Sequence, residues 1–128
     1  DGACLAHLVG SGVTPVVAPL AHDGSGQMLN VNADTIAATV AVALAGHFDV
    51  TLTYCFEKPG VLARADDEES VIRRITREDF PRLMAGGIIS GGMIPKIENA
   101  LSAIDRGVKR VVITGAEDIA GCRGTVVE

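Results

Sequence analysis

The apolar segments of this chain switch between strand-like and helical patterns, and this alternation constrains the fold more than any other feature. The run VTPVVAPL at 13–20 is typical of a strand buried on both faces, and FDVTLTYC at 48–55 and VKRVVIT at 108–114 predict further strands. Between the first two, Ile36, Val40 and Leu44 recur at helical spacing beside many alanines, which predicts a helix over 33–45 that Gly46 ends. Strands that alternate with helices predict βαβ crossovers, an α/β fold class and a mainly parallel sheet.

Two further helices are predicted between the second and third strands. Thr76 and Asp79 resemble a capping box that opens a short helix, which Gly86 and Gly87 end. Apolar residues at steps of three, four and three then predict a helix over about 92–106, with Gly107 as its end. The tail GTVV predicts a final edge strand, and HDGSGQ predicts a turn.

Bulk properties restrict the class of protein. With 128 residues, no internal repeat and no linker, the chain is predicted to be a single domain over 1–128. The net charge of −5 and the scattered basic residues argue against a nucleic-acid partner. No apolar run reaches the length of a membrane span, so we expect no membrane association and a cytoplasmic location. The three cysteines lie far apart, which favours buried thiols in a reducing compartment, and the histidines have no metal-ligand spacing.

The segment QMLNVNADT carries three alternating polar residues, Asn30, Asn32 and Asp34. In an extended segment all three side chains would project to one side and could bind a polar ligand at the mouth of the following helix. The alternative is that Asp34 caps that helix while the asparagines satisfy local turns. Spacing alone leaves both interpretations open.

The segment ISGGMIPK places two glycines before a helix and Lys96 near its first turn. Free N–H groups at such a helix start, together with the lysine, would bind an anion such as phosphate. Without an anion, a cation at this end of a helix costs about 0.3–1 kcal/mol. The alternative is a surface lysine behind a glycine turn, and the pattern alone does not separate the two.

Taken in order, PVVAPLAHDGSGQMLNVNADT, KPGVL, GGMIPKIENAL, VKRVVIT and GTVV resemble the C-terminal half of the N-acetylglutamate kinases, a branch of the amino-acid kinase family. The resemblance spans nearly the whole chain. It implies a three-layer αβα sandwich with a mainly parallel sheet. It also implies transfer of the γ-phosphoryl group of ATP, with Mg²⁺ carried by the nucleotide, to the γ-carboxylate of N-acetyl-L-glutamate in arginine biosynthesis.

The resemblance also implies roles for particular residues. Lys96 would contact the phosphates, Asp34 would orient the catalytic lysines, and Asn30 would hold the acylglutamate. The nucleotide site would be formed by Glu57, Lys58, Pro59, Gly60, Val61, Leu62, Ile88, Ile89 and Ser90.

Two departures from the family pattern restrict these expectations. The glycine-rich phosphate loop, the second catalytic lysine and the acylglutamate-binding arginine of the family's N-terminal half have no match in 1–128, so the chain alone is expected to be inactive. Glu57 stands where the family usually has an aspartate, and an acyl group such as succinyl stays open. The alternative function is a non-catalytic nucleotide- or effector-binding module. The resemblance implies a homo-oligomer for the whole protein.

Overall fold

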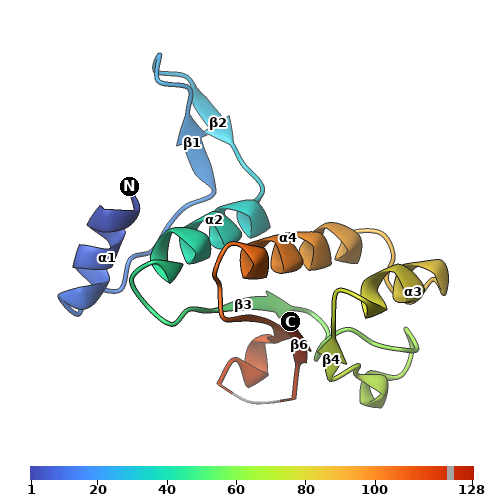
Figure 1. The fold of residues 1–128 in the computed structure, drawn as a ribbon. Coiled ribbons are helices and arrows are strands. Elements are labelled where there is room, and N and C mark those ends of the chain that lie inside the picture. Colours follow the sequence, from blue (N-terminus) through green and yellow to red (C-terminus); the bar gives the residue numbers. More distant parts are fainter. Residues whose placement is uncertain (121–122) are drawn as a thin grey trace.

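The computed structural model describes residues 1–120 and 123–128. Its elements follow one another along the chain as shown in Figure 1. They are α1 (Gly2–Gly10), β1 (Leu20–His22), β2 (Met28–Asn30), α2 (Ala33–Ala45), β3 (Thr51–Phe56), the 3₁₀ turn η1 (Glu68–Ser70), β4 (Arg74–Ile75), α3 (Asp79–Ala85), α4 (Met93–Asp105), β5 (Arg110–Gly115), the 3₁₀ turn η2 (Ala116–Asp118) and β6 (Thr125–Val127).

The main sheet has four strands in the order β3-β5-β6-β4. Strands β3 and β5 run parallel over six residue pairs, from Thr51 opposite Arg110 to Phe56 opposite Gly115. Strand β6 is antiparallel to β5 and parallel to β4. The predicted α/β class with a mainly parallel sheet is therefore confirmed. Strands β1 and β2 form a separate antiparallel hairpin that projects from the rest of the chain, joined by the predicted turn (Figure 1).

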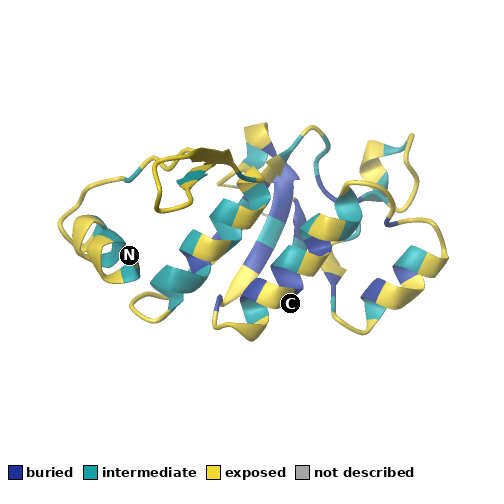
Figure 2. Cartoon of the chain, turned by 90° about the horizontal axis from the view of Figure 1, so that it is seen from above, coloured by how far each residue is buried: buried dark blue, intermediate teal, exposed yellow. Residues whose placement is uncertain are grey.

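Helices α2 and α4 lie side by side on one face of the main sheet (Figure 1). Alternate residues of β3 and β5 point toward these helices and are buried, because successive side chains of a strand face opposite sides. Figure 2 shows the buried residues concentrated where the central strands meet the two helices. The core includes Leu52, Tyr54, Val111, Ile113, Val127, Ile97, Ala100 and Leu101.

Local signals explain where the helices begin and end. Helix α2 has the predicted bounds, since the Asn32 side chain accepts a hydrogen bond from the Thr35 N–H at 3.2 Å and Gly46 follows the last turn. The capping box before α3 is confirmed, because the Asp79 N–H donates to Thr76 Oγ1 and the Thr76 N–H donates to Asp79 Oδ2. Helix α4 is followed by Gly107, whose φ of 101° suits glycine.

The strand predicted over 13–20 is wrong, and the tail is a strand as predicted but not at the predicted edge position. Residues 13–19 form no strand, and Val16 is 96% exposed. No strand within the described residues pairs with this segment, so its backbone lacks the ladder of hydrogen bonds that a buried strand needs. The tail is a strand but not an edge, since β6 lies between β5 and β4 and Thr125 is fully buried.

The prediction of buried thiols is also wrong for Cys4 and Cys55. Cys4 and Cys55 are both exposed, because α1 presents Cys4 to solvent and Cys55 points away from α2 and α4. Cys122 lies outside the described residues. Within the described part of the chain, no helix is long and apolar enough to cross a membrane.

Candidate active site

The structure joins the two polar motifs through an ion pair between Lys96 and Asp34. Lys96 comes from the first turns of α4 and Asp34 from the first turn of α2, 62 residues apart in sequence. Lys96 Nζ lies 2.5 Å from Asp34 Oδ2. The lysine side chain is 18% exposed and the carboxylate side chain 26%, so solvent screens this pair less than a surface pair.

The electrostatics of the helix ends explain this pairing. Lys96 is the fourth residue of α4, where the positive end of the helix dipole disfavours a cation. Asp34 lies at the corresponding end of α2, where an anion is favoured. The carboxylate thus supplies, within the chain, the negative charge that the position of Lys96 requires. The interpretation of Lys96 as a plain surface lysine is wrong.

Tyr54 on β3 completes the cluster, and sequence reasoning missed it. Its ring centroid lies 5.4 Å from Lys96 Nζ, a distance typical of a cation–π contact, and its hydroxyl donates to the Asp34 backbone carbonyl at 3.1 Å. Burial raises the pKa of Tyr54 to about 12, and the Asp34 charge adds to this shift. Its alternation with Leu52 on the inner face of β3 was the signal available in the sequence.

The three alternating polar residues do not project from one extended segment. Asn30 ends β2 opposite Leu20 and is exposed, whereas Asn32 caps α2 and Asp34 lies inside the helix. The interpretation of Asp34 as the cap is therefore wrong, since Asn32 has that role. This leaves the Asp34 carboxylate available to Lys96.

The glycine turn before α4 differs in detail from the expected anion site. The N–H groups of Met93 and Ile94 already donate to the carbonyls of Ser90 and Gly91, at 3.1 and 3.2 Å, so the expected free N–H groups of the first turn are absent there. Pro95 has no N–H. Among the described residues, the N–H groups of the turn itself, at Gly91 and Gly92, donate to no protein acceptor.

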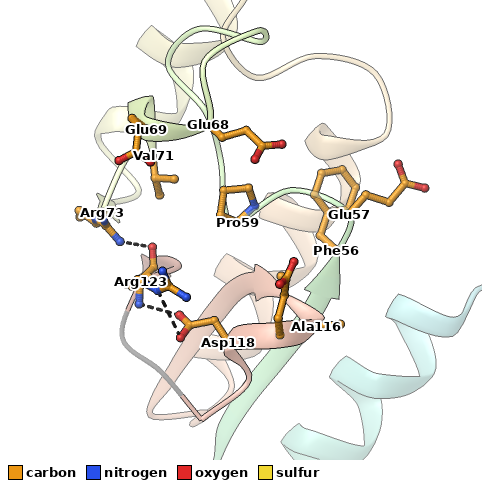
Figure 3. Close-up of a pocket in the computed structure, with 12 residues that line it drawn as sticks. Phe56, Glu57, Pro59, Glu68, Glu69, Val71, Arg73, Ala116, Asp118 and Arg123 are labelled. Carbon is orange, nitrogen blue, oxygen red and sulfur yellow. Dashed lines mark hydrogen bonds and ion pairs between the residues drawn. The ribbon is translucent and has the colours of Figure 1, made fainter.

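A cavity of about 480 Å³ opens at the carboxyl ends of β3 and β5 (Figure 3). Figure 3 shows Arg73 and Arg123 on one side of it and Phe56 and Glu57 on the other. Arg73 donates to the Arg123 carbonyl, and the Arg123 N–H donates to Asp118 Oδ2 at 2.9 Å. Its lining residues are Phe56, Glu57, Pro59, Glu68, Glu69, Val71, Arg73, Gly115, Ala116, Glu117, Asp118 and Arg123.

The structure divides the residues predicted to bind nucleotide. Glu57 and Pro59 line the cavity, whereas Lys96 and Ile88–Ser90 do not. Ile89 is buried in the core, and Ile88 and Ser90 are exposed beside the glycine turn. The cavity and the glycine turn are therefore separate features, and the cavity alone does not account for the predicted site.

Buried contacts fix the loop 57–62. The Val61 N–H donates to Thr125 Oγ1 at 2.8 Å, and a Cβ on Gly60 would lie 2.8 Å from both Thr125 Oγ1 and Val71 Cγ1. Lys58 pairs with Glu68 at 3.5 Å. Within the described residues, no group of three His, Cys, Asp or Glu side chains is placed to hold a metal ion.

Comparison with known families identifies the chain's relationship. The model of the amino acid kinase family matches residues 1–115. The chain belongs to the amino acid kinase family. A relative from Phocaeicola vulgatus, named acetylglutamate kinase, is 60% identical over 124 residues, which are 97% of this chain and 48% of the relative. The chain spans about half the length of the curated relatives it matches.

Solved structures of other proteins share this fold. A Streptococcus mutans protein, smu.665, is 31% identical, with a TM-score of 0.80 over 99% of this chain and 47% of that one. A Giardia carbamate kinase, at 16% identity, has a TM-score of 0.71 over 98% of this chain and 46% of its own. The latter similarity concerns the fold alone and agrees with the α/β class expected for an amino acid kinase.

Proposed function

We propose that this chain is the nucleotide-binding half of an acylglutamate kinase, whose remaining half lies in a longer protein. The reaction would transfer the γ-phosphoryl group of ATP to the γ-carboxylate of N-acetyl-L-glutamate, a step of arginine biosynthesis. The names of the relatives support the kinase chemistry, and their length supports the assignment to one half. For the whole protein we expect a homo-oligomer in the cytoplasm.

The observation that carries this proposal is the Lys96–Asp34 pair. Two motifs that resemble one family, NVNADT and GGMIPK, meet in space at a distance of 2.5 Å between charged atoms. Phosphoryl transfer depends mostly on positioning and on neutralising charge on the transferred group. An ammonium group held by a carboxylate at two helix starts suits that task.

The roles of the chain's own residues follow from this arrangement. Lys96 would neutralise charge on the phosphoryl oxygens, and Asp34 would orient the ammonium group. Asn30, exposed at the end of β2, would hold the acylglutamate. A carboxylate acceptor is already anionic at pH 7, so no strong general base is required.

The nucleotide would contact loop 57–62 and residues 88–90. The unused N–H groups of Gly91 and Gly92 and the partly exposed Lys96 suit phosphate oxygens, so the residues present fit the nucleotide. Mg²⁺ would arrive with the nucleotide and share the charge of its phosphates. The Glu57 and Pro59 side of the loop faces the cavity, whose size lies within the range of small-ligand pockets.

The test uses the full-length protein that contains residues 1–128. Lys96→Ala should lower kcat for acylglutamate phosphorylation by roughly 10²–10³-fold, the loss typical when one charge-stabilising donor is removed. The KM for ATP should change far less. Steady-state kinetics with acetylglutamate and with succinylglutamate would measure both parameters and compare the acyl groups.

The matched control is Lys109→Ala. Lys109 forms a similar ion pair with Asp49, at 2.7 Å, but this pair is exposed and lies near the amino ends of β3 and β5. This variant should retain wild-type kcat. Unaltered turnover in Lys96→Ala, or equal losses in both variants, would contradict the proposed roles.

A second candidate is a non-catalytic nucleotide- or effector-binding module. Calorimetry with Mg-ATP, combined with a turnover assay, separates the two functions. Binding without turnover in the full-length protein would favour the module, and turnover would favour the kinase.

A further inference from the structure

We propose that Tyr54 is a positioning residue that fixes the Lys96 ammonium group against Asp34. Its effect on turnover rests on the proposed kinase function, whereas its effect on the position of Lys96 does not. No comparison with known proteins assigns a role to this tyrosine, and the resemblance that pointed to Lys96 and Asp34 did not include it.

The contacts of Tyr54 join three elements. From the inner face of β3, its ring lies against Lys96 of α4 and its hydroxyl donates to the carbonyl of Asp34 in α2. The residue is only 4% exposed, so neighbouring core residues hold the ring in place. Lys96 therefore has two fixed neighbours, an aromatic face and a carboxylate.

A purely structural role would not require these polar contacts. Leucine or isoleucine would fill a core position on β3 without a hydroxyl that needs a partner. Here both ends of the side chain meet the charged pair: the ring meets the cation, and the hydroxyl meets the backbone of the residue that carries the anion. A phenol is already a neutral donor at physiological pH, and burial raises its pKa further, to about 12.

Positioning of this kind matters because a lysine side chain is long and flexible. Holding its ammonium group in one place removes rotamer freedom, and that entropy is lost before the phosphoryl group arrives. Loss of the aromatic face should let the ammonium group move away from its position beside Asp34. The kcat should then fall by a larger factor than the affinity for nucleotide.

The first experiment measures the position of Lys96 without any assay of turnover. The full-length protein is treated with a limiting amount of an amine-acetylating reagent, and labelling of each lysine is followed by peptide mass spectrometry. Tyr54→Leu should raise labelling of Lys96 by about tenfold, the ratio expected from a desolvated cation–π contact. Tyr54→Phe, which keeps the ring and removes the hydroxyl, should raise it by about threefold.

Internal controls distinguish a change in the position of Lys96 from a general loosening of the core. Lys58 and Lys109 are more exposed lysines of the same chain, and their labelling should not change. Leu52→Ala opens the core two residues away on the same face of β3, and no described interaction joins Leu52 to Lys96. This variant should leave Lys96 labelling at the wild-type level. Equal labelling of Lys96 in wild type and Tyr54→Leu would overturn the proposal, as would an equal increase in Leu52→Ala.

The second experiment concerns turnover. Tyr54→Leu should lower kcat by about tenfold with little change in the KM for ATP, and should cause no further loss in a Lys96→Ala background. An equal loss in both backgrounds would refute the link through Lys96. If the wild-type protein phosphorylates no acylglutamate, the proposed function fails, while the labelling result still decides whether Tyr54 positions Lys96.

Discussion

Replacing Thr125 by valine should lower the free energy of unfolding by about 1–3 kcal/mol, the usual cost of leaving a buried donor unsatisfied. Thr125 is fully buried, and its Oγ1 accepts a hydrogen bond from the Val61 N–H at 2.8 Å. Valine has nearly the same shape, so packing is retained while the N–H loses its acceptor. The change also releases the loop 57–62.

Thr114→Val is the matched control. Thr114 is buried like Thr125, but its Oγ1 has no hydrogen-bond partner among the described residues. Removing this hydroxyl takes away a desolvated polar group that makes no compensating bond, so stability should stay unchanged or rise by about 1 kcal/mol. The same chemical change should thus destabilise the chain at Thr125 but not at Thr114.

Equilibrium urea unfolding measures both variants. With a slope of about 2 kcal/mol/M, a loss of 2 kcal/mol lowers the midpoint by about 1 M, and the slope itself should not change. Hydrogen exchange at the Val61 amide should become faster in Thr125→Val only. Equal midpoints for Thr125→Val and Thr114→Val would refute the reasoning, because then the bond to Val61 would contribute nothing measurable.

Two further predictions concern Gly60 and Tyr54. Gly60→Ala should lower the urea midpoint, because its Cβ would lie 2.8 Å from Thr125 Oγ1 and Val71 Cγ1, whereas Gly46→Ala, whose Cβ meets nothing within 4 Å, should not. For Tyr54, the pKa in the folded chain is raised from 10.0 to about 12, so the unfolded chain loses the phenol proton first. Its contribution to stability should therefore be complete below pH 10 and disappear as the pH rises toward 12. The ultraviolet absorbance of tyrosinate, taken as the difference between wild type and Tyr54→Phe, should show no ionisation near pH 10 while the protein is folded; ionisation at that pH would contradict the burial of the phenol.

Local signals made the helices α2, α3 and α4 predictable. Asn32 and Gly46 flank α2, and the Thr76–Asp79 box spans the start of α3, so each boundary depends on residues within one turn of it. The bonds from Thr76 also hold the pKa of the Asp79 carboxyl below its ordinary value. Such features need no knowledge of the rest of the chain.

Long-range pairings could not be predicted in the same way. The residues of 13–20 have the composition of a buried strand, but composition does not supply a pairing partner. The position of β6 depends on β4 and β5, which its own sequence does not specify. For the candidate site, resemblance pointed to Lys96 and Asp34 separately, but their contact across 62 residues, and the place of Tyr54 between them, came only from the packing of α2, β3 and α4.

The central place of β6 has a consequence for the order in which a ribosome-bound chain can fold. Strands β3 and β5 can pair as soon as residue 115 has left the ribosome, but among the described strands β4 pairs with β6, which is made about fifty residues later. Until then the carbonyls of Arg73 and Ile75 accept no hydrogen bonds from the N–H groups of Val126 and Glu128. The Val61 N–H likewise has no hydrogen bond to Thr125 Oγ1. The loop 57–62 is thus synthesised early but reaches its final position last. In an arrested chain that ends before residue 125, β3 and β5 would be paired, but the loop would lack its hydrogen bond to Thr125.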